Sequence, residues 1–119
     1  MQAAVWGPAG WTFLHSVAHG FPDDPAGFDR ENGLPVGTTS SRYQQFFMLV
    51  GSVLPCRYCR DSYLLYVSES PPRTCSRSTL TKWLWEIHNK VNTKLGAKYK
   101  GADFPSACAR YESYRAKCS

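Results

Sequence analysis

The sequence predicts an all-α domain, organised as a small helical bundle. Apolar residues recur at spacings of three and four in several separate segments, which is the pattern of helices with one buried face. No segment shows the alternation of apolar and polar residues that is typical of strands. A chain of 119 residues, with 43% hydrophobic and 19% charged residues, suits a single globular domain over residues 1–119.

The first predicted helix covers residues 4–20. Its apolar stripe consists of Trp11, Leu14, Val17, Ala18 and Phe21. Pro22 should end this helix, because proline cannot continue the backbone hydrogen-bond pattern. We expect the next stretch, residues 22–40, to be a long loop, since it is rich in proline, glycine and polar residues.

A second helix should begin with a capping box at Ser41 and Gln44. Its buried face consists of Tyr43, Phe46, Phe47, Val50 and Leu54. Pro55 predicts a kink, after which a third helix should run to about Val67. The segment Ser68–Ser78 contains two adjacent prolines and should form a loop.

The fourth helix has the clearest pattern, with Ser78 as the expected N-cap and Gly96 as the expected C-cap. Its apolar stripe consists of Leu80, Leu84, Ile87, Val91 and Leu95. After it, we expect a short fifth helix around Ala107–Arg115, with a tail over roughly residues 109–119.

The fourth helix also carries a second, polar face, about a third of its circumference wide, formed by Trp85, His88, Asn89 and Asn92. Asparagine and histidine have only middling helix propensity, so their grouping needs an explanation. Two interpretations stay open. The face is either a partly buried polar network that ties the bundle together, or a wall that binds a heteroaromatic ring through the tryptophan and the polar groups.

Cys56 and Cys59 are the only closely spaced cysteines, and they are expected in the first turn of the third helix and one turn deeper. A helix N-terminus, together with Arg57 and Arg60, stabilises a thiolate, which favours redox chemistry. A zinc site needs four ligands, and no second cysteine pair supplies them. His15 and His19 are spaced like metal ligands, but no nearby Glu or Cys completes a site. A small zinc-stabilised helical interaction module is therefore the alternative function.

Charge and hydropathy exclude several other functions. The net charge of +5 suits an anionic ligand such as a phosphorylated cofactor, but the basic residues are scattered and we expect no nucleic-acid partner. No run of about 18 apolar residues exists, so no membrane span is expected. The N-terminus lacks the basic region of a signal peptide. The compartment stays unknown: the cytoplasm, or a compartment reached without a cleaved signal.

Three motifs, over about residues 6–108, together resemble the Erv/ALR-type FAD-linked sulfhydryl oxidases. They are a W-G-x-x-x-W-x-x-L-H pattern from Trp6, the Pro-Cys-x-x-Cys of residues 55–59, and the His-Asn-x-Val-Asn-x-x-Leu-Gly pattern from His88. The resemblance implies a four-helix bundle with a short fifth helix, FAD bound at the mouth of the bundle beside the cysteine pair, and a homodimer.

The resemblance also implies an activity and a set of site residues. Cys56 would exchange with thiols of a protein substrate to form its disulfides, and Cys59 would pass the electrons to FAD, from which O2 takes them as hydrogen peroxide. The cofactor-binding residues would be Gly7, Trp11, His15, Trp85, His88, Asn89, Val91, Asn92, Lys94, Leu95 and Lys98. Among these, Lys94 and Lys98 are the candidates for the FAD phosphates. We expect no metal site.

The chain departs from the family pattern at Trp85, where the family often has a cysteine bonded to one near position 108. Cys108 therefore needs another partner. We prefer a Cys75–Cys108 bond, which would close a loop of about 30 residues and stabilise the fold. A Cys108–Cys118 bond on the tail is the rival pairing. The resemblance implies a chain close to a minimal catalytic core, as in family members from large DNA viruses, and for a viral protein the expected compartment is the host cytoplasm.

Overall fold

The computed structural model describes residues 1–95 and 101–115, and the side chains of all of these except Leu95. These residues form six helices and no strand, which confirms the predicted all-α class. The helices are α1 (Ala3–His19), α2 (Pro25–Glu31), α3 (Thr38–Val53), α4 (Arg57–Glu69), α5 (Arg77–Leu95) and α6 (Phe104–Glu112). No helix among the described residues is both long and apolar enough to span a membrane.

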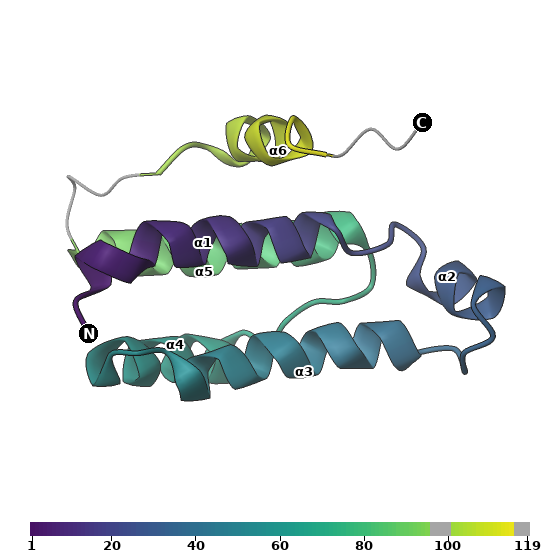
Figure 1. The fold of residues 1–119 in the computed structure, drawn as a ribbon, viewed down its shortest axis with the longest axis horizontal. Helices are drawn as coiled ribbons and strands as arrows, with labels where there is room; N and C mark the ends of the chain where they lie inside the picture. The colour runs from purple at the N-terminus through teal and green to yellow at the C-terminus, as the bar shows by residue number, and fades with distance from the viewer. Residues whose placement is uncertain (96–100, 116–119) are drawn as a thin grey trace.

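Four long helices make a bundle of two layers (Figure 1). α1 packs along α5 in one layer, α3 packs along α4 in the other, and α5 also contacts α4. The short α6 lies across the outer side of the first layer, where it contacts both α1 and α5. This is the predicted bundle with a short extra C-terminal helix.

The core lies between the two layers and uses the apolar stripes that the sequence predicts on α1, α3 and α5. Its buried members are Leu14, Ala18, Phe21, Phe47, Val50, Tyr63, Val67, Leu80, Trp83, Leu84 and Ile87. Trp83, which lies outside the predicted stripe, is the largest fully buried side chain. Its ring meets Phe47 edge-on, and its indole nitrogen donates to the Ser70 carbonyl oxygen at 2.7 Å. Burial of these side chains provides the main driving force for the fold.

The prediction of a loop over residues 22–40 is wrong, because this stretch contains α2. The Asp24 carboxylate caps α2 by accepting from the Gly27 amide at 3.0 Å, and Pro25 occupies the first helical turn. Asp29, fully buried, then accepts from the Gly37 amide at 2.9 Å and the Thr39 hydroxyl at 2.5 Å. A carboxylate from one helix thus satisfies donors at the start of the next.

Several predicted helix boundaries are also wrong. α3 begins at Thr38, because Asp29 supplies the capping oxygen that Ser41 was expected to supply. α5 begins at Arg77, because Ser76 and Thr79 exchange hydrogen bonds between their side chains and backbone amides, whereas Ser78 lies inside the helix.

At the C-terminal side, α6 starts and ends three residues earlier than the fifth helix predicted from the sequence. Asp103 caps it, with its carboxylate accepting from the Ser106 amide at 2.9 Å. The helix therefore takes up the start of the predicted tail. The expected C-cap Gly96 lies outside the described residues.

Candidate functional site

The cysteine pair lies where α3 ends and α4 begins. Cys56 is the N-cap of α4, not a residue of its first turn, and its Sγ accepts from the Cys59 backbone amide at 3.3 Å. Both thiols are half-buried and unpaired. The hydrogen bonds from the thiol and amide of Cys59 lower the pKa of Cys56, whereas burial raises the pKa of Cys59 to about 11. The two thiols are therefore chemically unequal, with Cys56 the better nucleophile.

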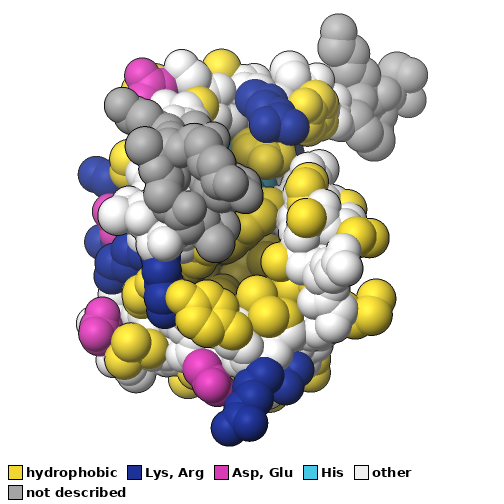
Figure 2. Space-filling view, turned by 90° about the vertical axis from the view of Figure 1, so that its left-hand side faces the viewer, with side chains coloured by type: hydrophobic (Ala, Val, Ile, Leu, Met, Phe, Trp, Pro, Cys, Tyr) yellow, Lys and Arg dark blue, Asp and Glu magenta, His cyan; other side chains and the backbone are white. Residues whose placement is uncertain are grey.

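This junction shares one end of the bundle with the start of α1 and the C-terminal part of α5 (Figure 1). Seen from that end, the surface has a hollow lined by hydrophobic side chains (Figure 2). Val5 of α1, Val53 of α3 and Tyr58 of α4 are large exposed hydrophobic residues close to these helix ends. The cysteine pair thus lies at the end of the bundle that carries this apolar hollow, which could receive a flat ring.

Predicted site residues from α1 and α5 meet in the first layer. The Trp11 and His88 rings stack with centroids 3.8 Å apart, and His15 Nε2 lies 2.9 Å from His88 Nδ1. Burial lowers the pKa of His15 to about 3 and that of His88 to about 4, so both imidazoles are neutral at pH 7. In this pair one nitrogen donates and the other accepts.

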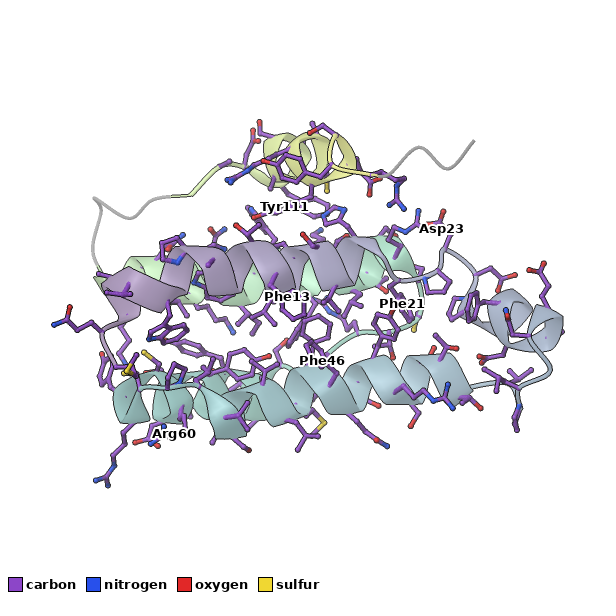
Figure 3. All side chains as sticks on the ribbon, in the orientation of Figure 1. Phe13, Phe21, Asp23, Phe46, Arg60 and Tyr111 are labelled. Carbon is purple, nitrogen blue, oxygen red and sulfur yellow. The ribbon has the colours of Figure 1, made fainter. Side chains whose placement is uncertain are left out.

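α6 covers His15 and His19 of α1, a contact that sequence reasoning did not predict. Tyr111 points from α6 towards α1 (Figure 3) and stacks on His15 and His19, with ring centroids 4.8 and 5.4 Å away. Glu112 pairs with His19 Nδ1 at 2.8 Å, and Arg115 donates to the His19 carbonyl oxygen at 2.8 Å. The sequence signal for this contact was the adjacent aromatic and acidic pair, Tyr111 and Glu112, at the end of a short helix.

The rest of the predicted polar face of α5 meets the segment before α6. Trp85 donates from its indole nitrogen to the Ala102 carbonyl oxygen at 3.0 Å, and its ring contacts Phe104. Asn89 and Asn92 lie beside Gly101, where an added Cβ would come within 3.7 and 3.1 Å of their side-chain amides. These contacts favour the polar-network interpretation for Trp85, while the asparagines remain half-buried at the same surface.

Other predicted site residues are dispersed. Lys94 turns to α4, where its Nζ donates to the Ser62 hydroxyl at 2.9 Å and lies over the Tyr58 ring. Gly7 is half-buried beside open space, since an added Cβ would meet nothing within 4 Å. Val91 is half-buried. The Leu95 side chain and all of Lys98 lie outside the described part of the chain.

The preferred Cys75–Cys108 bond is absent from the structure, in which both residues are unpaired thiols. Cys75 is exposed in the segment between α4 and α5, and a hydrogen bond from Ser40 to the Thr74 carbonyl oxygen holds this segment at α3. Cys108 belongs to α6, which packs on the opposite layer. The rival pairing involves Cys118, which lies outside the described residues.

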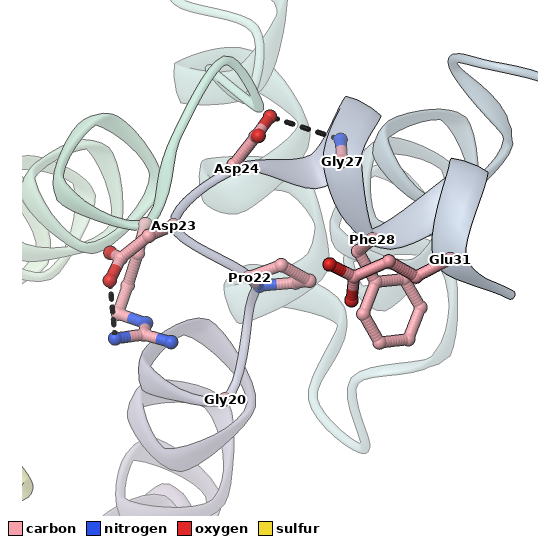
Figure 4. A pocket seen from close by; sticks show the side chains of 8 residues that line it. Gly20, Pro22, Asp23, Asp24, Gly27, Phe28 and Glu31 are labelled. Carbon is pink, nitrogen blue, oxygen red and sulfur yellow. Dashed lines mark hydrogen bonds and ion pairs between the residues drawn. The ribbon is translucent and has the colours of Figure 1, made fainter.

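A separate open pocket of about 400 Å³ lies at the α1–α2 turn, at the other end of the bundle from the cysteines (Figure 4). Asp23, Asp24 and Glu31 line it, and Arg77 bridges to Asp23 at 3.1 Å. No predicted site residue contributes to it. Within residues 1–95 and 101–115, no group of three metal-ligating side chains occurs either. The Cys56–Cys59 pair therefore defines the candidate site.

The sequence model of the Erv1 / Alr family matches residues 8–112, most of the chain. The chain belongs to the Erv1 / Alr family. It is 36% identical over 89 residues to the mitochondrial FAD-linked sulfhydryl oxidase ERV1 of Saccharomyces cerevisiae, covering 75% of this chain and 42% of the yeast protein. It is 38% identical over 101 residues to the probable FAD-linked sulfhydryl oxidase R368 of Acanthamoeba polyphaga mimivirus, covering 82% of this chain and 64% of that protein.

Solved structures agree with the Erv1 / Alr assignment. The crystal structure of the FAD binding domain of Erv1 from Saccharomyces cerevisiae superposes with a TM-score of 0.80 at 29% sequence identity, covering 95% of this chain and 96% of that one. The yeast Erv1 core superposes with a TM-score of 0.79. The predicted family is thereby confirmed. This Erv1 / Alr chain spans about half the length of the curated relatives it matches.

Proposed function

We propose that this protein is an FAD-dependent thiol oxidase that forms disulfide bonds in protein substrates. The support is its membership of a family whose relatives are named FAD-linked sulfhydryl oxidases, together with the unequal cysteine pair at the mouth of the bundle. The geometry of the pair carries the proposal: Cys56 is the N-cap of α4, and its sulfur accepts from the Cys59 backbone amide at 3.3 Å. Two adjacent thiols at a helix start suit sequential thiol–disulfide exchange.

The site residues fit a large heteroaromatic cofactor. The hollow beside the cysteines is apolar, Gly7 leaves open space, and the buried indole nitrogen of Trp6 lacks a partner among the described residues. His15, His88 and Asn92 would line the adjoining surface. FAD, when bound, would accept two electrons from the thiols and pass them to O2, giving hydrogen peroxide.

The chain's own contribution is to keep the two sulfurs in different roles. Cys56, at the helix N-cap, would exchange with the incoming substrate thiol, since its lowered pKa makes a thiolate more accessible. Cys59, whose thiol pKa is raised by burial, would face the cofactor. Each turnover would remove two electrons and two protons from a pair of substrate thiols, which leave as a disulfide.

The variant Cys59→Ser tests this proposal. The purified wild-type protein should show flavin absorbance between about 350 and 500 nm and consume oxygen with dithiothreitol. Cys59→Ser should keep the flavin and lose oxygen consumption, while Cys75→Ser, which alters an exposed thiol away from the site, should keep both. A colourless wild-type protein, or a Cys59→Ser variant with wild-type turnover, would contradict the proposal.

We also propose that the protein is a homodimer. Phe13 of α1 and Leu49 of α3 are large hydrophobic side chains that are more than half exposed, and their helices lie on the same face of the bundle (Figures 1 and 3). A second copy would bury them. Sedimentation of the wild type should give a dimer, and Phe13→Glu should shift it to the monomer. A wild-type monomer at micromolar concentration would contradict this proposal.

The zinc-module alternative has no support. It would need four ligands around one ion, and the described residues contain no group of even three.

A further inference from the structure

Trp6, in the first turns of α1, has a buried polar atom that the fold does not satisfy. Its indole nitrogen Nε1 has almost no exposed surface and no hydrogen-bond partner among the described residues. An indole N–H can only donate, and burying a donor without an acceptor costs free energy. Native proteins rarely leave such a group unpaired, so each case calls for an explanation.

The packing of Trp6 keeps its ring in this place. The indole lies against Gly10, one turn further along α1, where an added Cβ would come 3.4 Å from Trp6 Cε3. A methyl group there would make ordinary van der Waals contact with the ring, so the ring packs directly over this turn of α1. Gly7, next in sequence to Trp6, borders open space in which an added Cβ would meet no atom within 4 Å. The unpaired donor and this open space therefore belong to the same turn of α1.

Trp6 also shares its end of the bundle with the cysteine pair. The start of α1 lies at the same end as the α3–α4 junction, around the apolar hollow (Figures 1 and 2). The N-terminal part of α1 and the cysteine pair therefore lie at the same end of the bundle.

We propose that Trp6 is a positioning residue for the cofactor, and that its indole N–H donates a hydrogen bond to an acceptor of the bound flavin ring. This inference rests on the proposed function. The flavin ring system carries carbonyl oxygens and unprotonated ring nitrogens, so it offers the acceptor that the fold lacks. A directed bond from a rigid indole would fix the orientation of the ring at the mouth of the bundle.

Trp6→Phe in the flavin-loaded protein tests the inference, since it removes the donor and keeps an aromatic ring. The flavin should dissociate about three- to tenfold more readily, as expected for one lost hydrogen bond. The indole proton resonance that disappears in Trp6→Phe should, in the wild type, shift when flavin binds. With saturating flavin, the unfolding midpoint of Trp6→Phe should fall only by the small amount that its weaker flavin binding explains.

Trp83→Phe is the matched control, because the Trp83 indole already donates to the Ser70 carbonyl oxygen in the core. This variant should lower the unfolding midpoint and leave flavin affinity unchanged. If Trp6→Phe binds flavin as tightly as the wild type, or behaves like Trp83→Phe, the inference is overturned while the proposed function stands. A wild-type protein that binds no flavin would overturn both.

Discussion

His15 and His88 lie 73 residues apart in the sequence, yet His15 Nε2 and His88 Nδ1 are 2.9 Å apart in the structure. This bond links α1 to α5 within the first layer of the bundle. Burial keeps both rings neutral, because the pKa of His15 falls to about 3 and that of His88 to about 4. A proton added to the accepting ring would remove the acceptor on which the bond depends.

The first prediction concerns pH. Both histidines have folded-state pKa values below the unfolded value of about 6.5, so the unfolded chain binds more protons between about pH 4 and 6.5. The free energy of unfolding should therefore be greatest above pH 6.5 and fall as the pH decreases. Each imidazole can contribute up to about 1.4 kcal/mol per pH unit.

Urea unfolding at pH 7.5, 6.0 and 5.0 would measure this dependence. The double variant His15→Gln/His88→Gln should be less stable at pH 7.5 but should lose less stability towards pH 5.0. Parallel pH profiles for the double variant and the wild type would show that other groups cause the decline.

A second prediction concerns the two thiols. In the reduced protein without oxygen, iodoacetamide should modify Cys56 on the order of tenfold faster than Cys59, because the pKa of Cys56 is lowered and that of Cys59 is raised to about 11. Mass mapping of peptides over time would give both rates. The exposed Cys75 serves as an internal reference for the reagent. Equal rates for the two site cysteines would contradict their assigned roles.

The anchoring of α6 gives the third prediction. Tyr111→Ala removes a buried ring that stacks on His15 and His19, and should cost about 3 kcal/mol of unfolding free energy. Amide hydrogen exchange in α6 should accelerate more than in α3. Tyr114→Ala removes an exposed tyrosine three residues further on, and it should lower the free energy of unfolding by less than about 1 kcal/mol. Similar losses for the two variants would refute this anchoring role.

The fourth prediction contrasts two glycines. A Cβ at Gly51 would lie 2.6 Å from Tyr63 Cδ1 and 2.8 Å from Leu64 Cδ2, so Gly51→Ala should force α3 and α4 apart and cost about 1–3 kcal/mol. Gly7→Ala meets no atom and should stabilise helix α1 by about 0.5–1 kcal/mol while weakening flavin binding. Thermal unfolding and flavin titration would separate the two effects. Weaker flavin binding in Gly51→Ala with unchanged stability would contradict the assignment of Gly51 to the α3–α4 contact.

Much of the architecture could be predicted from local sequence patterns. The stripes around Leu14, Phe47 and Leu84 form the core, because apolar residues at helical spacing lie on one face and are stabilised when these faces are buried against each other. Pro55 marked the break between α3 and α4, because it cannot continue a helix. The position of the Cys56–Cys59 pair at a helix start followed from that break.

Helix ends were predicted less well because their caps come from residues that sequence proximity does not reveal. Asp29 caps α3 from within α2, and α2 itself was missed because a helix of seven residues has little periodicity to detect. The reciprocal hydrogen bonds of Ser76 and Thr79 at the start of α5 were not predicted, because Ser78, two positions after Ser76, is an equally suitable N-cap residue. Caps depend on the approach of one oxygen to one amide, which composition does not determine.

The sequence by itself determined that the chain is all-helical, that one thiol pair begins a helix, and that α5 carries a polar face, because each depends on short-range spacing along one helix. Only the tertiary structure decided what that face meets. Trp85 pairs with Ala102, His88 with His15, and Tyr111 closes over the histidines. These contacts join separate segments of the chain. The packing of α1 on α5, and of α6 on both, brings them together rather than any local pattern.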